Sequence, residues 1–134
     1  MHSKLTNGVQ MTFDEFRDEM NAHWQSTDKE ARSRKDPHIS LERLIALYGK
    51  FDADERRMAD QVLTEWVLSE DEGLRFDARV LIDHQKIIVA IPALEERAKA
   101  LTSIATPGAP FELQAINCLL KKLGGDACRI VGDR

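Results

Sequence analysis

The chain has 134 residues and a formal net charge of −4, with 43% hydrophobic and 31% charged residues. This length allows one domain with a substantial core, and the composition is that of a globular protein rather than a disordered or membrane-embedded one. The negative charge argues against generic binding to nucleic acids or anionic membranes. The 7 glycines and 4 prolines are too few to connect many short strands, so the composition favours an all-α fold.

Hydrophobic spacing predicts a first helix that begins at Thr12. Thr12 and Glu15 form a capping box, in which each side chain accepts a hydrogen bond from an otherwise free backbone N–H. The apolar stripe of this helix is Phe13, Phe16, Met20 and Trp24. A polar segment is expected to extend the helix to about Ser33, before a loop at Pro37.

Two further helices are expected in the middle of the chain. One runs from about Ser40 to Gly49, and the next follows Asp52, which forms a second capping box with Glu55. The expected inner faces are Leu41, Leu44, Ile45 and Tyr48 in the first of these helices, and Met58, Val62 and Trp66 in the second. Trp66 is in register with its stripe, which places it in the core.

The second half of the chain predicts three more helices. A capping box at Ser69–Glu72 opens the fourth, and Pro92 lies in the first turn of the fifth, where its missing N–H costs nothing. The sixth runs over Phe111–Leu123 after a loop at 102–110. The residues expected to face inward are Leu74, Ala78, Leu81 and Ile82 in the fourth, Ile91, Leu94, Ala98 and Leu101 in the fifth, and Ala115, Ile116, Leu119 and Leu123 in the sixth.

Two local features need a decision between alternatives. The β-branched residues at 86–91 would suit a strand, but no second segment is suited to pair with it, so a strand is rejected. Cys118 lies in an apolar run and is expected to be buried, and together with Cys128 it makes no metal-binding motif.

The pattern of apolar segments indicates where the protein resides. The longest apolar run, at 87–91, is far too short to cross a bilayer, and the N-terminus lacks the apolar core of a signal peptide. A cytoplasmic protein is therefore expected.

The segment at 74–101 carries the most specific pattern in the chain. Its first part reads Leu74-Arg75-x-x-Ala78-x-x-Leu81-Ile82, and its second part opens with Ala90-Ile91-Pro92-Ala93-Leu94. This pattern resembles a HEAT-like repeat of the bacterial type, with Asp83-His84-Gln85-Lys86 in place of the usual glycine of the turn. The resemblance implies a short stack of antiparallel helix pairs, either an α-solenoid or an irregular helical bundle. The chain length predicts a single helical-repeat domain over 1–134, and the ends at 1–11 and 126–134 are expected to be flexible.

The sequence offers little that points to catalysis. The four histidines show no metal-ligand spacing on one helix, and nucleotide-binding and nucleophile-elbow motifs are missing. We therefore expect no catalytic residue, no cofactor and no metal. Arg75 and Arg79 lie four apart on one predicted helix, and two interpretations stay open. They either pair with a carboxylate or carbonyl groups of a neighbouring helix, or they bind a phosphate or carboxylate ligand, which would need more convergent donors.

The acidic side chains are concentrated in the middle of the chain, because residues 51–96 carry 12 acidic and 5 basic residues. Helix capping and solvation explain such acids, and a basic partner steered toward them is the functional alternative. Trp24 either anchors a partner or closes the end of the core. The candidate partner-binding residues are Trp24, Asp52, Asp54, Glu55, Glu70, Asp71 and Glu72.

These features favour a non-enzymatic protein–protein interaction module. One concrete version is an acidic bacterial inhibitor or immunity-type protein that covers a basic site. The expected partner is a protein, with no nucleic acid and no membrane, and a homo-oligomer stays open. The alternative is a small-ligand-binding protein or enzyme with a pocket between helices. Two or more titratable side chains buried together, with perturbed pKa values, would favour the alternative.

Overall fold

A computed structural model describes residues 11–124, and in this range it is helical, with no strand. The predicted all-α class with about six helices is confirmed. The elements are α1 (Phe13–Arg34), α2 (His38–Gly49), α3 (Ala53–Trp66), α4 (Glu72–Gln85), the short 3-10 helix η2 (Ile88–Ala90), α5 (Ile91–Leu101) and α6 (Ala109–Leu123). Nearly all of the ends predicted to be flexible, and Cys128, lie outside the described residues.

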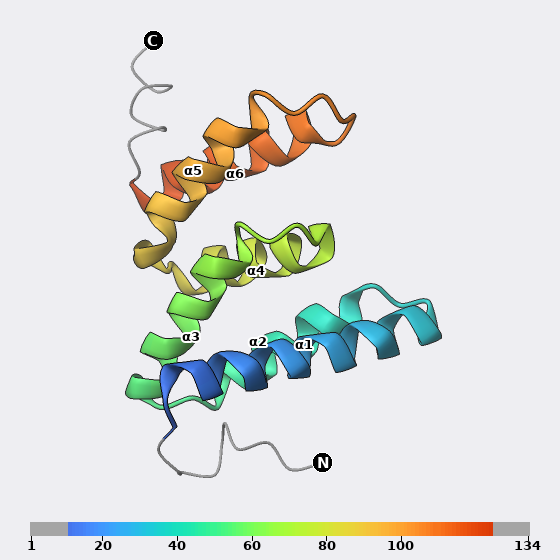
Figure 1. The fold of residues 1–134 in the computed structure, drawn as a ribbon, viewed down its shortest axis with the longest axis vertical. Coiled ribbons are helices and arrows are strands. Elements are labelled where there is room, and N and C mark those ends of the chain that lie inside the picture. The colour runs from blue at the N-terminus through green and yellow to red at the C-terminus, as the bar shows by residue number, and fades with distance from the viewer. Residues whose placement is uncertain (1–10, 125–134) are drawn as a thin grey trace. The chain divides into compact units, whose positions relative to one another are not determined.

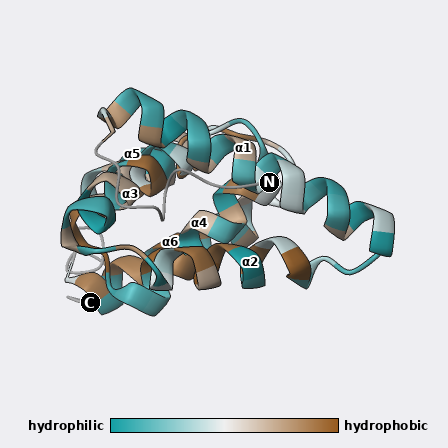
Figure 2. Ribbon diagram, turned by 90° about the horizontal axis from the view of Figure 1, so that it is seen from below, coloured by the Kyte–Doolittle hydropathy of each residue, from teal (hydrophilic) through white to brown (hydrophobic). Residues whose placement is uncertain are grey.

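The chain divides into two compact units. The boundary falls between Val62 and Leu63, within α3. In the first unit α1 and α2 lie side by side, and in the second α5 lies along α6, which also contacts α4 (Figure 1). Bands of hydrophobic and hydrophilic residues alternate along the helices (Figure 2), as amphipathic packing requires.

The buried face of α1 extends further along the helix than the apolar stripe from Phe13 to Trp24 predicts. The capping box is present: Glu15 N–H donates to Thr12 Oγ1 at 3.1 Å, and Thr12 N–H donates to Glu15 Oε1 at 3.0 Å. Past Trp24, the buried face continues through Thr27 and Ala31. A small residue and a threonine carry little hydrophobic signal, so the sequence did not reveal this extension. The Thr27 hydroxyl is satisfied because it donates to the Trp24 carbonyl at 3.0 Å.

An aromatic group forms the core of the first unit. Phe16 is fully buried, and its ring centroid lies 5.2 Å from that of Phe51, which in turn lies 6.1 Å from Tyr48. The Tyr48 hydroxyl donates to Asp60 Oδ1 at 2.8 Å. Burial, together with this bond to a carboxylate, raises the pKa of Tyr48 above its usual value. The hydroxyl therefore stays a hydrogen-bond donor across the physiological pH range.

The capping box predicted for α3 is confirmed, and its contribution to the free energy of unfolding can be tested. Glu55 N–H donates to Asp52 Oδ1 at 2.8 Å, and Asp52 N–H donates to Glu55 Oε1 at 2.9 Å. Replacing Asp52 with alanine removes one acceptor from the helix N-terminus, so the free energy of unfolding should fall by about 1 kcal/mol. Urea denaturation followed by circular dichroism measures this loss. Gln61→Ala, an exposed change on the same helix, should stay within about 0.5 kcal/mol of the wild type.

Helix α4 begins later than its predicted capping box. Its N-cap is Asp71, whose Oδ1 accepts from Leu74 N–H at 3.2 Å, while Ser69 Oγ accepts from Asp71 N–H at 3.0 Å. Aspartate is an effective N-cap, and here it displaces the serine from that position. On the predicted inner face, Ala78, Leu81 and Ile82 are fully buried and Leu74 is half-buried.

The connection from α4 to α5 shows how the chain turns without the usual glycine. Lys86 adopts the left-handed conformation with φ of 55°, and its N–H donates to the carbonyls of Asp83 and Ile82. The 3-10 turn η2 then leads into α5, where Pro92 lies in the first turn as predicted. The rejection of a strand at 86–91 is confirmed.

The helix predicted over Phe111–Leu123 is present as α6, but two residues expected to be buried in it are exposed. The helix begins at Ala109, with Ile116, Leu119 and Leu120 buried. Ala115 and Cys118, both predicted to face inward, are exposed. Their hydrophobic neighbours made them look like part of the stripe, but Leu120 is buried instead.

Among residues 11–124, none of the helices has the length and apolar character needed to cross a membrane.

Candidate functional site

Three arginines surround one glutamate in the second unit. We call these four residues, Arg75 and Arg79 of α4, Arg97 of α5 and Glu112 of α6, the arginine cluster. Arg75 binds the carboxylate with two hydrogen bonds, Nε to Oε2 at 2.9 Å and Nη2 to Oε1 at 3.1 Å. Arg97 does the same, with distances of 2.9 and 3.2 Å. Arg79 Nη1 lies 3.5 Å from Glu112 Oε2.

Local sequence explains how these side chains meet. Arg75 and Arg79 are four residues apart, so they lie on one face of α4. Glu112 lies in the first turn of α6, where the helix dipole favours a negative charge. Arg75 is anchored further, because its Nη1 donates to the Ser69 carbonyl at 2.9 Å. All four side chains are only 10–16% exposed.

Burial and charge together set the ionisation of the cluster. Burial by itself would raise the pKa of Glu112, but hydrogen bonds from Arg97 and Arg75, and their positive charges, lower it to about 2. Burial lowers the pKa of Arg79; the Glu112 carboxylate opposes this effect, and the Arg75 and Arg97 charges reinforce it. The cluster therefore holds a carboxylate that is ionised near neutral pH, and its third guanidinium is less well paired than the other two.

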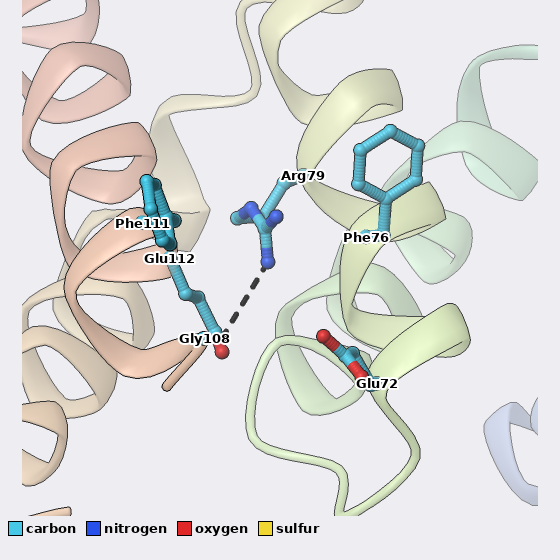
Figure 3. A pocket seen from close by; sticks show the side chains of 6 residues that line it. All are labelled: Glu72, Phe76, Arg79, Gly108, Phe111 and Glu112. Carbon is cyan, nitrogen blue, oxygen red and sulfur yellow. Dashed lines mark ion pairs between the residues drawn. The ribbon is translucent and has the colours of Figure 1, made fainter. Parts of the chain in front are cut away.

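A pocket opens beside Arg79, between α4 and the start of α6. It has a volume of about 320 Å³, and we call it the arginine pocket. Its lining residues are Glu72, Phe76, Arg79, Gly108, Phe111 and Glu112. Figure 3 shows Arg79 reaching from α4 toward Glu112 on α6.

Two phenylalanines of the arginine pocket are exposed to solvent. Phe111 is 74% exposed and Phe76 is 49% exposed. The guanidinium carbon of Arg79 lies 5.6 Å from the centroid of the Phe76 ring, within the range of a cation–π contact. The pocket thus combines an apolar rim with a cation at its wall, an arrangement that suits a ligand with an acidic group next to an apolar one.

The structure supports a different one of the two interpretations for each arginine of the pair Arg75 and Arg79. Arg75 pairs with a carboxylate of a neighbouring helix, as the structural interpretation predicts. Arg79 lines a pocket, which the ligand-site interpretation requires. Sequence reasoning found neither Arg97 nor Glu112 as partners, because they come from other helices. Phe111 carried a usable signal, since a phenylalanine at the start of α6 lies outside the apolar stripe of that helix.

The acidic residues predicted to bind a partner have mainly structural contacts. Asp52, Glu55 and Asp71 cap α3 and α4, and Asp54 is paired with Arg57. Glu70 is exposed in the turn before α4.

Of the other two predicted partner-binding residues, Glu72 is exposed and Trp24 is buried. Glu72 is exposed and lines the arginine pocket. Trp24 is only 4% exposed, which fits its alternative role of closing the end of the core.

Residues 11–124 contain no group of three or more histidine, cysteine, aspartate or glutamate side chains arranged to hold a metal ion. His84, in the last turn of α4, is exposed, and its Nδ1 lies 3.1 Å from Gln85 Nε2.

No family model, curated protein or solved structure matches this chain. The function of the protein is therefore inferred from the geometry of the arginine pocket.

Proposed function

We propose that this protein is a non-enzymatic protein-interaction module and that the arginine pocket is its contact surface. The observation that carries this proposal is the exposure of Phe76 and Phe111, from two different helices, beside one pocket. Aromatic residues and arginine are enriched at the energetic centres of protein interfaces. Covering these two rings would remove a large apolar area from water, which favours association.

The ionisation of the arginine cluster supports a binding role over acid–base catalysis. A general acid or base works best with a pKa near the operating pH. The pKa of Glu112 is about 2, so it is neither a proton donor nor an effective base near neutrality. Arginine remains charged in proteins and does not exchange protons at this pH.

The HEAT-like pattern at 74–101 agrees with this proposal, because stacked helix pairs offer extended surfaces to protein partners. The version in which an acidic surface covers a basic site would use Asp52, Asp54 or Glu70. Asp52 and Asp54 already take part in a cap and an ion pair. The exposed phenylalanines therefore give stronger support than the acids do.

A second candidate is a binding site for a small carboxylate. Arg79 and Glu112 are titratable side chains buried together, with displaced pKa values, which is the feature expected of the small-ligand alternative. A volume of about 320 Å³ is large enough for a metabolite. The exposed rings extend beyond what a small ligand needs, so we place this candidate second.

Affinity purification tests the proposal with matched variants. Tagged wild-type protein, Phe76→Ser, Phe111→Ser and Ile88→Ser are expressed in the source organism, and co-purifying proteins are quantified by mass spectrometry. Ile88 is 65% exposed but does not line the pocket, so its variant is the control. A stoichiometric partner should be recovered with the wild type and with Ile88→Ser. Its recovery should fall at least about tenfold with either phenylalanine variant.

Equal recovery with all four proteins would remove the arginine pocket from the interaction. If no stoichiometric partner appears under several growth conditions, and citrate or succinate raises the melting temperature in a thermal-shift assay, the small-ligand candidate replaces the proposal.

A further inference from the structure

The charges around the arginine pocket do not balance. Arg79 interacts electrostatically with Arg75, Arg97, Glu72 and Glu112. These five side chains comprise three cations and two anions, so the group of charges around Arg79 has one positive charge in excess. A partly buried charge without full compensation is a favourable place for one negative charge from a ligand.

The guanidinium of Arg79 is the donor with unused capacity. Arg75 and Arg97 each donate two hydrogen bonds to the Glu112 carboxylate, at distances of 2.9–3.2 Å. The contact of Arg79 with the same carboxylate is 3.5 Å, longer than any of these four bonds. The Glu112 carboxylate already accepts two hydrogen bonds from each of two guanidinium groups. Arg79 can therefore donate two N–H groups to a second carboxylate in a bidentate pair.

The first two backbone positions of α6 offer no free N–H group to an anion. Gly108 is the N-cap of α6, but Ala109 N–H donates to the Thr106 carbonyl at 3.1 Å, and Pro110 has no N–H. A free C-terminal carboxylate is usually held by several backbone N–H groups. A carboxylate side chain that pairs with a guanidinium matches the donors present here better.

We infer that the partner of the arginine pocket presents an aspartate or glutamate side chain next to an aromatic or large aliphatic one, with the carboxylate on Arg79 and the apolar group between Phe76 and Phe111. This inference rests on the proposed function and adds the chemistry of the partner. It reverses the partner charge expected from the acidic middle of the chain, because the five charges around Arg79 sum to a positive value.

Phosphate-bearing partners fit this pocket less well. A phosphate group near neutral pH carries close to two negative charges, whereas the group of charges around Arg79 has one positive charge in excess. A single carboxylate matches the excess charge.

Selection from a random peptide library tests the inference. Dodecapeptides displayed on phage are selected against the full-length wild-type protein, and the enriched sequences are then synthesised with amidated C-termini. Binding is measured by fluorescence polarisation to the wild type, Arg79→Gln, Phe111→Ser and Ile88→Ser. Enriched peptides should carry aspartate or glutamate beside an aromatic or aliphatic residue. Their affinity should fall at least about tenfold with Arg79→Gln and stay unchanged with Ile88→Ser.

The outcomes separate the inference from the proposed function. Peptides without acids, or with equal affinity for Arg79→Gln, overturn the inference, and the proposed function stands if Phe111→Ser still abolishes binding. Loss of binding upon amidation assigns the pocket to a terminal carboxylate and also overturns the inference. If sedimentation shows a wild-type dimer that Phe111→Ser dissociates, the partner is a second copy and the inference fails. Binding that neither Phe76→Ser nor Phe111→Ser changes contradicts the proposed function itself.

Discussion

Replacing Glu112 with glutamine is expected to lower the free energy of unfolding by about 3 kcal/mol. The carboxylate accepts two hydrogen bonds each from Arg75 and Arg97, and the side chain is only 11% exposed. Glutamine has a similar shape but no charge, so three nearly buried guanidinium groups would lose their common counter-ion. Breaking a buried ion pair by removing one partner typically costs about 3–5 kcal/mol. Urea denaturation at pH 7 measures the difference.

The pH dependence of the same variant shows whether the charge is responsible. The pKa of Glu112 is about 2 in the folded protein and 4.5 ordinarily, so its ionised form stabilises the fold. This contribution is fully present above about pH 4.5 and is lost as the pH falls toward 2. The difference between wild type and Glu112→Gln should therefore shrink over this range. Glu72→Gln, an exposed change in the same pocket, should stay within about 0.5 kcal/mol at pH 7. A constant difference from pH 7 to pH 2.5 would show that the carboxylate charge is not the cause.

Replacing Phe16 with alanine should destabilise the first unit by about 3–5 kcal/mol. Phe16 is fully buried on α1, and its ring lies 5.2 Å from that of Phe51. Removing it leaves a cavity in the aromatic core and also abolishes a ring–ring contact. Thermal unfolding followed by circular dichroism, with denaturant titration, measures the effect.

Phe13→Ala is the matched control for this second change. Phe13 is the same residue type on the same helix, is half-buried, and has the Arg17 guanidinium 5.3 Å from its ring centroid. Its replacement should cost less than half as much as that of Phe16. Equal losses for both variants would mean that burial against Phe51 does not dominate the stability of this core.

The arginine cluster shows why part of the site was beyond sequence reasoning. Arg75 and Arg79 were recognised as a pair because i and i+4 positions share a helix face. Their partner Glu112 lies 37 residues from Arg75, and Arg97 lies 15 residues from Glu112. Local periodicity contains no information on such distant contacts, because they depend on how α4 and α5 pack against α6. The third guanidinium that completes the cluster was therefore not foreseen.

The residues expected to face inward also show where local sequence patterns stop being informative. Large aliphatic residues such as Leu81, Ile82 and Leu94 were assigned to the core correctly, because their burial is strongly favourable. Ala115 and Cys118 were assigned to the core of α6 and are exposed. Small residues gain little from burial, so the orientation of the helix against its neighbours decides their environment.

The all-α class, the approximate helix positions and the capping boxes of α1 and α3 followed from the sequence, because spacing, capping boxes and proline positions act within a few residues of each other. The N-cap of α4 did not, because Asp71 takes the place predicted for Ser69. The sequence also contains no nucleotide-binding or nucleophile-elbow motif. Packing between the helices decided that Arg79 meets Glu112 and lines a pocket, and that Phe76 and Phe111 remain exposed beside it. The physical reason is that a pocket, and the excess charge around Arg79, arise from side chains that only packing between helices brings together.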